Sequence, residues 1–281
     1  MPILPNVRYE DMTWPDLKKA AEQDAVIVQP VGAIEQHGPH LPVSTDTMQV
    51  NNATFLACAE AAEQIPVLLA PTVHWGFSTI QMDIPNEDKD RYPGTLTLTA
   101  QLLMDLCVQL SQCFVRAGFK RILFVNGHGG NYQPLMTVAR TIRDLTDAMV
   151  GVANYYGLVE VKDMLDVPLE EASIKHAGEW ETSLALLWDA DNVRMDQIKS
   201  EQRAINAIKV NSEYVSRDEL GGKQYSTKAF VAEKNIDFSF EGVVGNPAQG
   251  SAEKGQKFAD LHVASIVEFL LEFKKWEYGK L

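Results

Sequence analysis

Short apolar runs alternate with longer amphipathic segments along this chain. The short runs have the length of strands and carry mostly apolar residues, as in Ala25–Val31, Val67–Ala70, Arg121–Val125 and Met149–Tyr155. Such runs predict strands that are buried on both faces. The longer segments repeat apolar residues at helical spacing and predict helices over Asp46–Gln64, Thr99–Ala117, Gln133–Thr146 and Lys254–Lys275.

Buried strands separated by helices predict an α/β fold with three layers, in which helices cover both faces of a mostly parallel sheet. We expect residues 1–281 to form a single domain. The periodicity weakens after Asp189, where a helix is expected over Ser200–Tyr214. Residues 215–253 are polar, contain several glycines and show little periodicity, so we predict an ordered loop or hairpin excursion there.

The overall charge excludes one class of partner. The formal net charge is −13, and nucleic-acid binding instead needs clusters of Lys and Arg. No apolar run of about 18 residues predicts a membrane span, and no export signal is visible at the N-terminus. Cys58, Cys107 and Cys113 lack CxxC spacing and are expected to be free, buried hydrophobes. We therefore expect a cytoplasmic protein without nucleic-acid or membrane partners.

Acidic and imidazole groups crowd the end of the first predicted strand. The fifteen residues from Gly32 to Asp46 include Glu35, His37 and His40. Burying such groups is costly unless their charge is compensated, and a divalent metal is the usual compensator because carboxylates and imidazoles are its ligands. Taken singly, Asp46 could simply favour a helix start. As a group, these residues predict metal ligation.

A second candidate stretch, Asn126–Asn131, reads Asn-Gly-His-Gly-Gly-Asn and follows the third apolar run. Its glycines allow a sharp turn that brings His128 to the end of the sheet. A phosphate-binding turn is the alternative, but a full GxGxxG is absent, so we favour His128 as a ligand. Ligands of parallel sheets bind beyond the carboxyl ends of the strands, where Glu35 and His128 should meet.

A third stretch runs from His176 to Ser183 and begins a predicted helix near Gly178. Glu181 would lie one turn inside that helix and could point into the site. Glu179 could equally be a solvent-facing acid of the first turn. Of the remaining histidines, His40 and His74 are candidates for lining the pocket, whereas His262 is expected to pack or to face solvent.

With these stretches assembled, the chain resembles the creatininase (creatinine amidohydrolase) family. The resemblance spans about residues 25 to 190 and rests on four motifs, which are Gly32–Pro42 with Thr45-Asp46, Tyr92–Thr95, Asn126–Asn131 and His176–Thr182. It implies an α/β hydrolase with a pair of divalent metals, zinc or manganese, with iron as a further candidate. It also implies a small-molecule substrate and a homo-oligomer, with a hexamer as the expected size.

Matching positions imply a role for each residue. Glu35 and His128 look like ligands of one metal and His37 of the other, with Asp46 bridging them. His176 resembles the catalytic histidine of the family. Creatininase itself has a glutamate two residues after the histidine that corresponds to His128, where this chain has Gly130; we infer that Glu181 supplies this carboxylate.

One further departure concerns substrate contacts. Gln81 and Met82 stand where relatives often have a histidine, so the family's substrate contacts are not carried over to this chain. The departure at Gly130 argues against creatinine as the substrate.

Our leading hypothesis is hydrolysis of a small, cyclic amide by a hydroxide that bridges the two metals. His176 would protonate the departing nitrogen, and Glu179 would orient an imidazole or a ligand. One alternative is hydrolysis of a carbon–carbon bond in a cyclic 1,3-diketone such as a diketo-inositol. Another is a non-catalytic metal-binding protein.

Overall fold

The computed structural model describes residues 3–78, 93–159, 176–198, 215–217, 229–231 and 242–278. Its central sheet has four strands in the order β2-β1-β3-β4, and each neighbouring pair is parallel. The strands are β1 (Val26–Val31), β2 (Val67–Leu69), β3 (Arg121–Asn126) and β4 (Met149–Asn154). The predicted parallel α/β sheet is confirmed.

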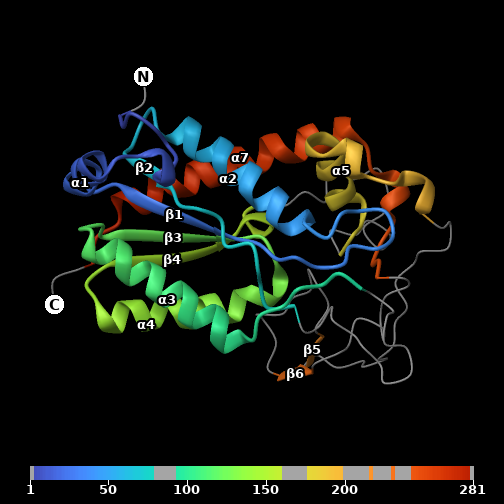
Figure 1. Cartoon of the computed structure of the whole chain (residues 1–281). Helices are drawn as coiled ribbons and strands as arrows, with labels where there is room; N and C mark the ends of the chain where they lie inside the picture. Colours follow the sequence, from blue (N-terminus) through green and yellow to red (C-terminus); the bar gives the residue numbers. More distant parts are fainter. Residues whose placement is uncertain are drawn as a thin grey trace.

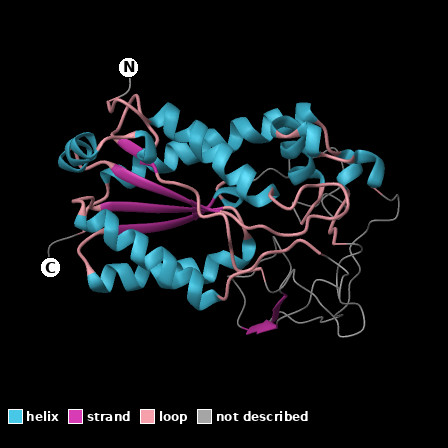
Figure 2. Cartoon of the chain, viewed as in Figure 1, coloured by secondary structure: helices cyan, strands magenta, loops and turns pink. Residues whose placement is uncertain are grey.

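Helices cover both faces of this sheet, which confirms the three-layer prediction. Figure 1 shows α2 and α7 on one face and α3 and α4 on the other, and Figure 2 shows the same layers by secondary structure. The helices are α1 (Trp14–Glu22), α2 (Thr45–Ala61), α3 (Ala100–Arg116), α4 (Tyr132–Leu145), α5 (Glu179–Trp188) and α7 (Ala252–Lys275). Short 3-10 turns lie at Tyr9–Asp11, Gly129–Asn131, Tyr155–Gly157, Ala190–Asn192, Met195–Gln197 and Pro247–Gln249.

Alternation along β1 explains why both faces need cover. Val26 and Val28 join the apolar cluster under α2 and α7, whereas Ile27 and Val31 join the cluster under α1, α3 and α4. Successive side chains of a strand point to opposite faces, so an all-apolar strand must be buried on both. Of the cysteines, Cys58 and Cys107 are buried as predicted. Cys113 is exposed, which corrects that expectation, because it lies on the solvent side of α3.

The order of the strands creates a switch point between β1 and β3. The chain passes from β1 to β2 on one side and later returns to β3 on the other side of β1. Crevices at the carboxyl ends of such neighbouring strands are the usual ligand sites of open α/β sheets. The loops that carry Glu35 and His128 leave the sheet at this point.

Only parts of the 215–253 excursion are described. Strands β5 (Val215–Arg217) and β6 (Ala229–Val231) pair in parallel, which a tight hairpin cannot produce. The helix predicted over Ser200–Tyr214 lies outside the described residues. From residue 242 the chain runs back against the first motif and then enters α7. Among the helices of the described ranges, none is both long and apolar enough to cross a bilayer.

Candidate metal centre

The five predicted metal ligands come together at the carboxyl ends of β1 and β3. Glu35 and His37 lie in the loop after β1, Asp46 is the second residue of α2, His128 follows β3, and Glu181 is in the first turn of α5. No more than 9% of any of the five is exposed. Residues that are far apart in the sequence therefore share one buried site.

Two glycines let α2 approach the strand ends closely enough to bring Asp46 into this site. A Cβ atom on Gly32 would lie 2.5 Å from the Thr47 Cα atom, and one on Gly127 would lie 2.6 Å from the Val50 Cβ atom. Contacts this short exclude any larger residue without movement of the backbone. The glycines of both motifs thus serve the packing of α2.

The candidate ligand atoms form three groups; Glu35, His37 and His176 make one, and the other two share Asp46. Of these two, one is Glu35, Asp46 and His128, the other is His37, Asp46 and Glu181, and within each group the atoms lie within 4.8 Å of one another. Asp46 turns Oδ1 to His37 Nε2 at 3.1 Å and Oδ2 to His128 Nδ1 at 2.9 Å. Each oxygen of one carboxylate therefore faces a different group.

Both histidines are held by backbone carbonyls on their outer side. His37 Nδ1 lies 3.0 Å from the Glu35 carbonyl oxygen, and His128 Nε2 lies 3.1 Å from the Phe77 carbonyl oxygen. A carbonyl oxygen can only accept, so each of these nitrogens donates its proton. The other ring nitrogen then faces the carboxylates, which is the arrangement typical of metal-bound histidine.

Glu35 lacks, among the described residues, the hydrogen-bond partners that buried acids normally have. Within the described part of the chain, neither oxygen of Glu35 accepts a hydrogen bond, although the residue is fully buried. Burial and the nearby carboxylates raise the pKa of Glu35 to about 8 and that of Glu181 to about 7, against the attraction of the histidines. Orphaned oxygens and crowded negative charge fit a site for cations.

The pKa values of the two histidines and of Asp46 shift in the direction that favours their charged forms. Burial lowers the pKa of His37 and His128, but attraction to the carboxylates outweighs it and raises the values to about 10 and about 9. Burial raises the pKa of Asp46, and the charge of His37 with the two imidazole contacts brings it well below its usual value. Protons on the histidines thus offset the carboxylates, and bound cations would replace them.

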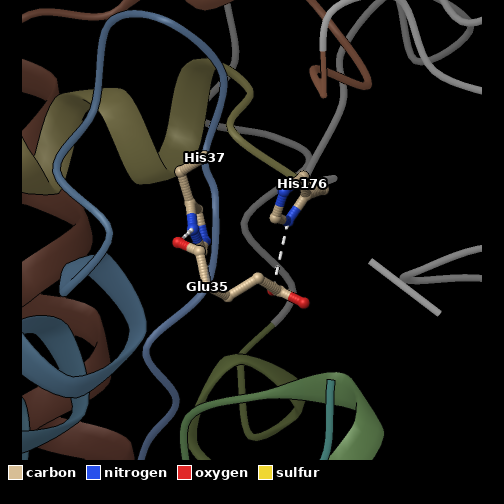
Figure 3. A group of neighbouring side chains, drawn as sticks. All are labelled: Glu35, His37 and His176. Carbon is tan, nitrogen blue, oxygen red and sulfur yellow. Dashed lines mark hydrogen bonds and ion pairs between the residues drawn. The ribbon is translucent and has the colours of Figure 1, made fainter. Parts of the chain in front are cut away.

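His176 faces the same centre from the turn before α5. Its Nδ1 atom lies 3.7 Å from Glu35 Oε2, and its ring centroid lies 4.2 Å from that of His37. Figure 3 shows His176 directed at Glu35. His176 Nε2 lies 2.7 Å from the Gln36 carbonyl oxygen and 3.0 Å from the Gln36 Nε2 atom; the shorter contact favours the tautomer with its proton on Nε2, which leaves Nδ1 bare. Burial and the charge of His37 lower the pKa of His176 well below its ordinary value, so the ring is neutral.

A strained residue links His176 to α5. Ala177 has φ +54°, a left-handed conformation that is uncommon for a residue with a Cβ atom. In this conformation its backbone N–H donates to Glu181 Oε2 at 2.5 Å. The strain is thus retained where it orients one of the candidate ligands.

The structure does not bring Glu179 to the centre. Its Oε1 atom lies 2.6 Å from Lys254 Nζ of α7, and no described histidine contacts its side chain. Its predicted role in orienting an imidazole therefore has no support among the described contacts. The residue is fully buried, so the alternative of a solvent-facing acid is wrong. The helix face of Glu179 points to α7 because α7 packs against α5.

The missing carboxylate next to His128 has a steric explanation. A Cβ atom on Gly130 would lie 2.0 Å from the Phe77 carbonyl oxygen and 2.8 Å from His128 Nε2. No side chain fits at position 130 in this backbone. Glu181 Oε2 lies 3.6 Å from His37 Nε2.

The other histidines have separate surroundings. His40 is buried and its Nε2 atom lies 3.0 Å from Thr182 Oγ1, whereas His74 is exposed. His262 is expected either to pack or to face solvent, and it packs in the core. It accepts a hydrogen bond from Trp180 Nε1. Sequence reasoning did not single out Trp180 or the buried polar residues around it.

Several known proteins are similar to this chain in sequence. The family model described as creatininase, creatinine amidohydrolase, matches residues 10–270. A creatinine amidohydrolase of Pseudomonas putida is 27% identical over 67% of this chain and 74% of its own. A mycofactocin precursor peptide peptidase of Mycolicibacterium smegmatis is 30% identical over 84% of this chain and 81% of its own. A 3-dehydro-scyllo-inosose hydrolase of Thermotoga maritima is 24% identical over 64% and 55%, respectively.

Solved structures of similar fold include a creatininase described as the Mn form and a mutant creatininase described as the Zn-Zn type. Each is 23% identical to this chain, and the match covers 95% of this chain and 98% of the solved one. Their TM-scores are 0.72 and 0.70. This level of similarity establishes the fold.

Proposed function

Because this chain belongs to the creatininase family, we propose that it is a metal-dependent hydrolase that cleaves a small amide at a site for two divalent ions. One observation carries the proposal: the two oxygens of buried Asp46 face two different groups of ligand atoms. A carboxylate that is shared in this way is the natural bridge between two ions.

Each ion would take three of the chain's side chains. Glu35, His128 and Asp46 would hold one, and His37, Glu181 and Asp46 the other. Oxygen and imidazole donors of this kind suit zinc and manganese. Bound divalent ions supply Lewis acidity and lower the pKa of water from about 15.7 towards about 7.

His176 would move the proton of the reaction. Its Nε2–H is held by the Gln36 carbonyl group, which keeps the bare Nδ1 directed at the centre. A neutral imidazole in this position can take a proton at Nδ1 from the attacking water and return it to the departing nitrogen. The nitrogen leaves as a neutral amine, and His176 returns to its neutral state.

Metal analysis combined with a substrate panel tests the proposal. We expect about two equivalents of zinc or manganese per chain, and turnover that disappears on chelation and returns with the metal. The panel should contain lactams, formamides and short peptides, because one relative is a peptide peptidase. A protein that holds two ions but shows no metal-dependent turnover on any such amide would contradict it.

The alternative is cleavage of a carbon–carbon bond in a cyclic 1,3-diketone. The similarity to the 3-dehydro-scyllo-inosose hydrolase of Thermotoga maritima favours it. A diketo-inositol assayed beside the amides distinguishes the two, because only amide cleavage releases a nitrogenous product. Hydrolysis of the diketone alone would replace the amide proposal while keeping the metal site. The oligomeric state stays a prediction.

A further inference from the structure

Four hydrogen bonds next to the candidate metal centre form a closed ring together with the backbone between Trp180 and Glu181 and with Tyr155 itself. The Tyr155 hydroxyl donates to Gln49 Oε1 at 3.0 Å, and Gln49 Nε2 donates to the Glu181 carbonyl oxygen at 2.8 Å. The neighbouring Trp180 donates from Nε1 to His262 Nε2 at 2.9 Å. His262 Nδ1 closes the ring on the Tyr155 carbonyl oxygen at 3.1 Å.

The direction of every bond in this ring is determined. The two carbonyl oxygens can only accept, so Gln49 must donate with its Nε2 atom and His262 with its Nδ1 atom. Gln49 Oε1 is then left to accept from Tyr155, and His262 Nε2 to accept from Trp180. Burial lowers the pKa of His262 to about 4, which keeps the imidazole neutral in this arrangement.

The ring joins the helices that carry two of the candidate ligands. Gln49 lies three residues after Asp46 on α2, and the bond from Gln49 reaches the backbone of Glu181 in the first turn of α5. Tyr155 is 1% exposed and Gln49 likewise, so water does not compete for these bonds. The Tyr155 ring also packs against Trp180, with centroids 5.5 Å apart.

We propose that Gln49 is a positioning residue that, with Tyr155, holds the first turn of α5 against α2 and thereby sets the separation of Glu181 from Asp46. This inference rests on the proposed function, because the separation matters only for the ion held by His37, Asp46 and Glu181. Mutation of a residue that holds a metal ligand in place typically lowers the metal affinity by about 10- to 100-fold. The ion held by Glu35, Asp46 and His128 has no ligand on α5 and should be affected less.

Stepwise metal affinities of the full chain test this inference. The protein is stripped with a chelator and titrated with Zn²⁺ against a chromophoric chelator, and the melting temperature of the metal-free protein is recorded in parallel. In Gln49→Leu, we expect one of the two binding constants to fall by about 10- to 100-fold and the other to change by less than about 3-fold. Tyr155→Phe, which removes one oxygen atom, should weaken the same step by less.

Two matched controls separate positioning from general stability. Gln29 is also fully buried, but its amide donates to the carbonyl groups of Pro30 and Pro71, away from α5. Gln29→Leu should lower the melting temperature and leave both binding constants unchanged. Trp180→Phe removes the N–H group that donates to His262 and should weaken the same metal-binding step as Gln49→Leu. Trp188→Phe on the same helix should not.

The outcomes are distinguishable. Unchanged binding constants in Gln49→Leu and Tyr155→Phe, with only lower melting temperatures, would overturn the positioning role and leave the proposed function intact. Equal weakening of both steps would also overturn it. If the unmodified protein binds fewer than two ions, the proposed function fails, and this inference fails with it. If Gln49→Leu does not fold, the single-atom change in Tyr155→Phe decides.

Discussion

The two ends of the parallel sheet treat their acidic residues in opposite ways. At the amino end, Asp24 Oδ2 lies 2.8 Å from Arg121 Nε and 2.7 Å from Lys274 Nζ. At the carboxyl end, Glu35, Asp46 and Glu181 are buried, and in the described part of the chain their ion-pair partners are all histidines. At the amino end, the charge of Asp24 is therefore neutralised by an arginine and a lysine of the chain itself.

The pKa values of Asp24, Glu35 and Glu181 follow this difference. Asp46 is the exception, since burial raises its pKa but its contacts with His37 and His128 outweigh burial and lower the value. Burial raises the pKa of Asp24, but the hydrogen bonds and charges of Arg121 and Lys274 outweigh it and lower the value. Burial raises the pKa of Glu35 and Glu181, and their histidine partners do not reverse the shift. The carboxyl end therefore carries acids that its histidines neutralise only in part, which fits a site for cations, whereas the acid at the amino end is paired with two fixed cations.

The largest effect is expected where the carboxyl end loses its shared acid. Asp46→Ala should release both ions and lower turnover by about 10³-fold or more, because metal stabilisation of the transition state is worth several kcal/mol. Metal analysis and steady-state kinetics measure it. Asp24→Ala is the control and should retain both ions. An Asp46→Ala protein that still holds two ions would rule out the bridge.

Next in size is the loss of the proton-transfer group. His176→Ala should keep both ions and lower kcat by about 10²- to 10⁴-fold, the range expected for general acid–base catalysis. Metal content and kcat measured on the same sample separate this variant from Asp46→Ala. Wild-type turnover in the metal-replete variant would remove His176 from the mechanism.

Metal should stabilise the carboxyl end measurably. A ligand at 100 times its dissociation constant stabilises the folded state by about 2.7 kcal/mol, which corresponds to a rise in melting temperature of roughly 5–10 °C for a chain of this size. Thermal unfolding with and without Zn²⁺ measures the shift. Glu181→Gln should show a smaller shift than the unmodified protein. An equal shift would exclude Glu181 from the site.

The metal-free protein should lose stability as pH rises. Glu35 and Glu181 have pKa values raised to about 8 and about 7, so their contribution is present at low pH and is lost as pH rises through these values. The pKa values of His37 and His128 are also raised, to about 10 and about 9, so the stability that they contribute is likewise lost as pH rises, and we expect the free energy of unfolding to fall between about pH 6 and 9. Urea unfolding measures it. Metal-loaded protein should show a flatter profile, because metal binding favours the deprotonated ligands.

The smallest effect is expected at the amino end. Asp24→Asn keeps a residue that tolerates the positive φ of +54° but removes the charge. Because the pair is partly exposed, the free energy of unfolding should fall by about 1 kcal/mol or less. Metal content and turnover should not change. A loss of metal in this variant would contradict the separation of the two ends.

Most of the fold was predictable because it depends on local pattern. The apolar runs at Ala25–Val31 and Arg121–Val125 became β1 and β3, and the glycines of the motifs predicted the turns that follow them. The convergence of Glu35 and His128 followed from the parallel sheet, since carboxyl ends of parallel strands share one edge. The loop or hairpin excursion over 215–253 stays a prediction; its strands β5 and β6 pair in parallel, which periodicity does not indicate because the pairing depends on contacts distant in sequence.

The partners of individual side chains were not predictable in the same way. Glu179 and Glu181 are two residues apart on one helix, yet Glu179 pairs with Lys254 and Glu181 approaches His37. Their sequence context is nearly the same, and only the packing of α5 between α2 and α7 separates them. Gln49 and Tyr155 carry no motif at all, and their bond spans 106 positions.

Residue order alone was sufficient to place carboxylates and imidazoles at strand ends and to predict a parallel α/β sheet, since periodicity and turn chemistry act over a few neighbours. Tertiary packing alone decided which of these groups meet, in what orientation, and which oxygens are left without a partner. The physical reason is that burial and charge interactions depend on distances in space, and those distances arise only when distant helices pack together.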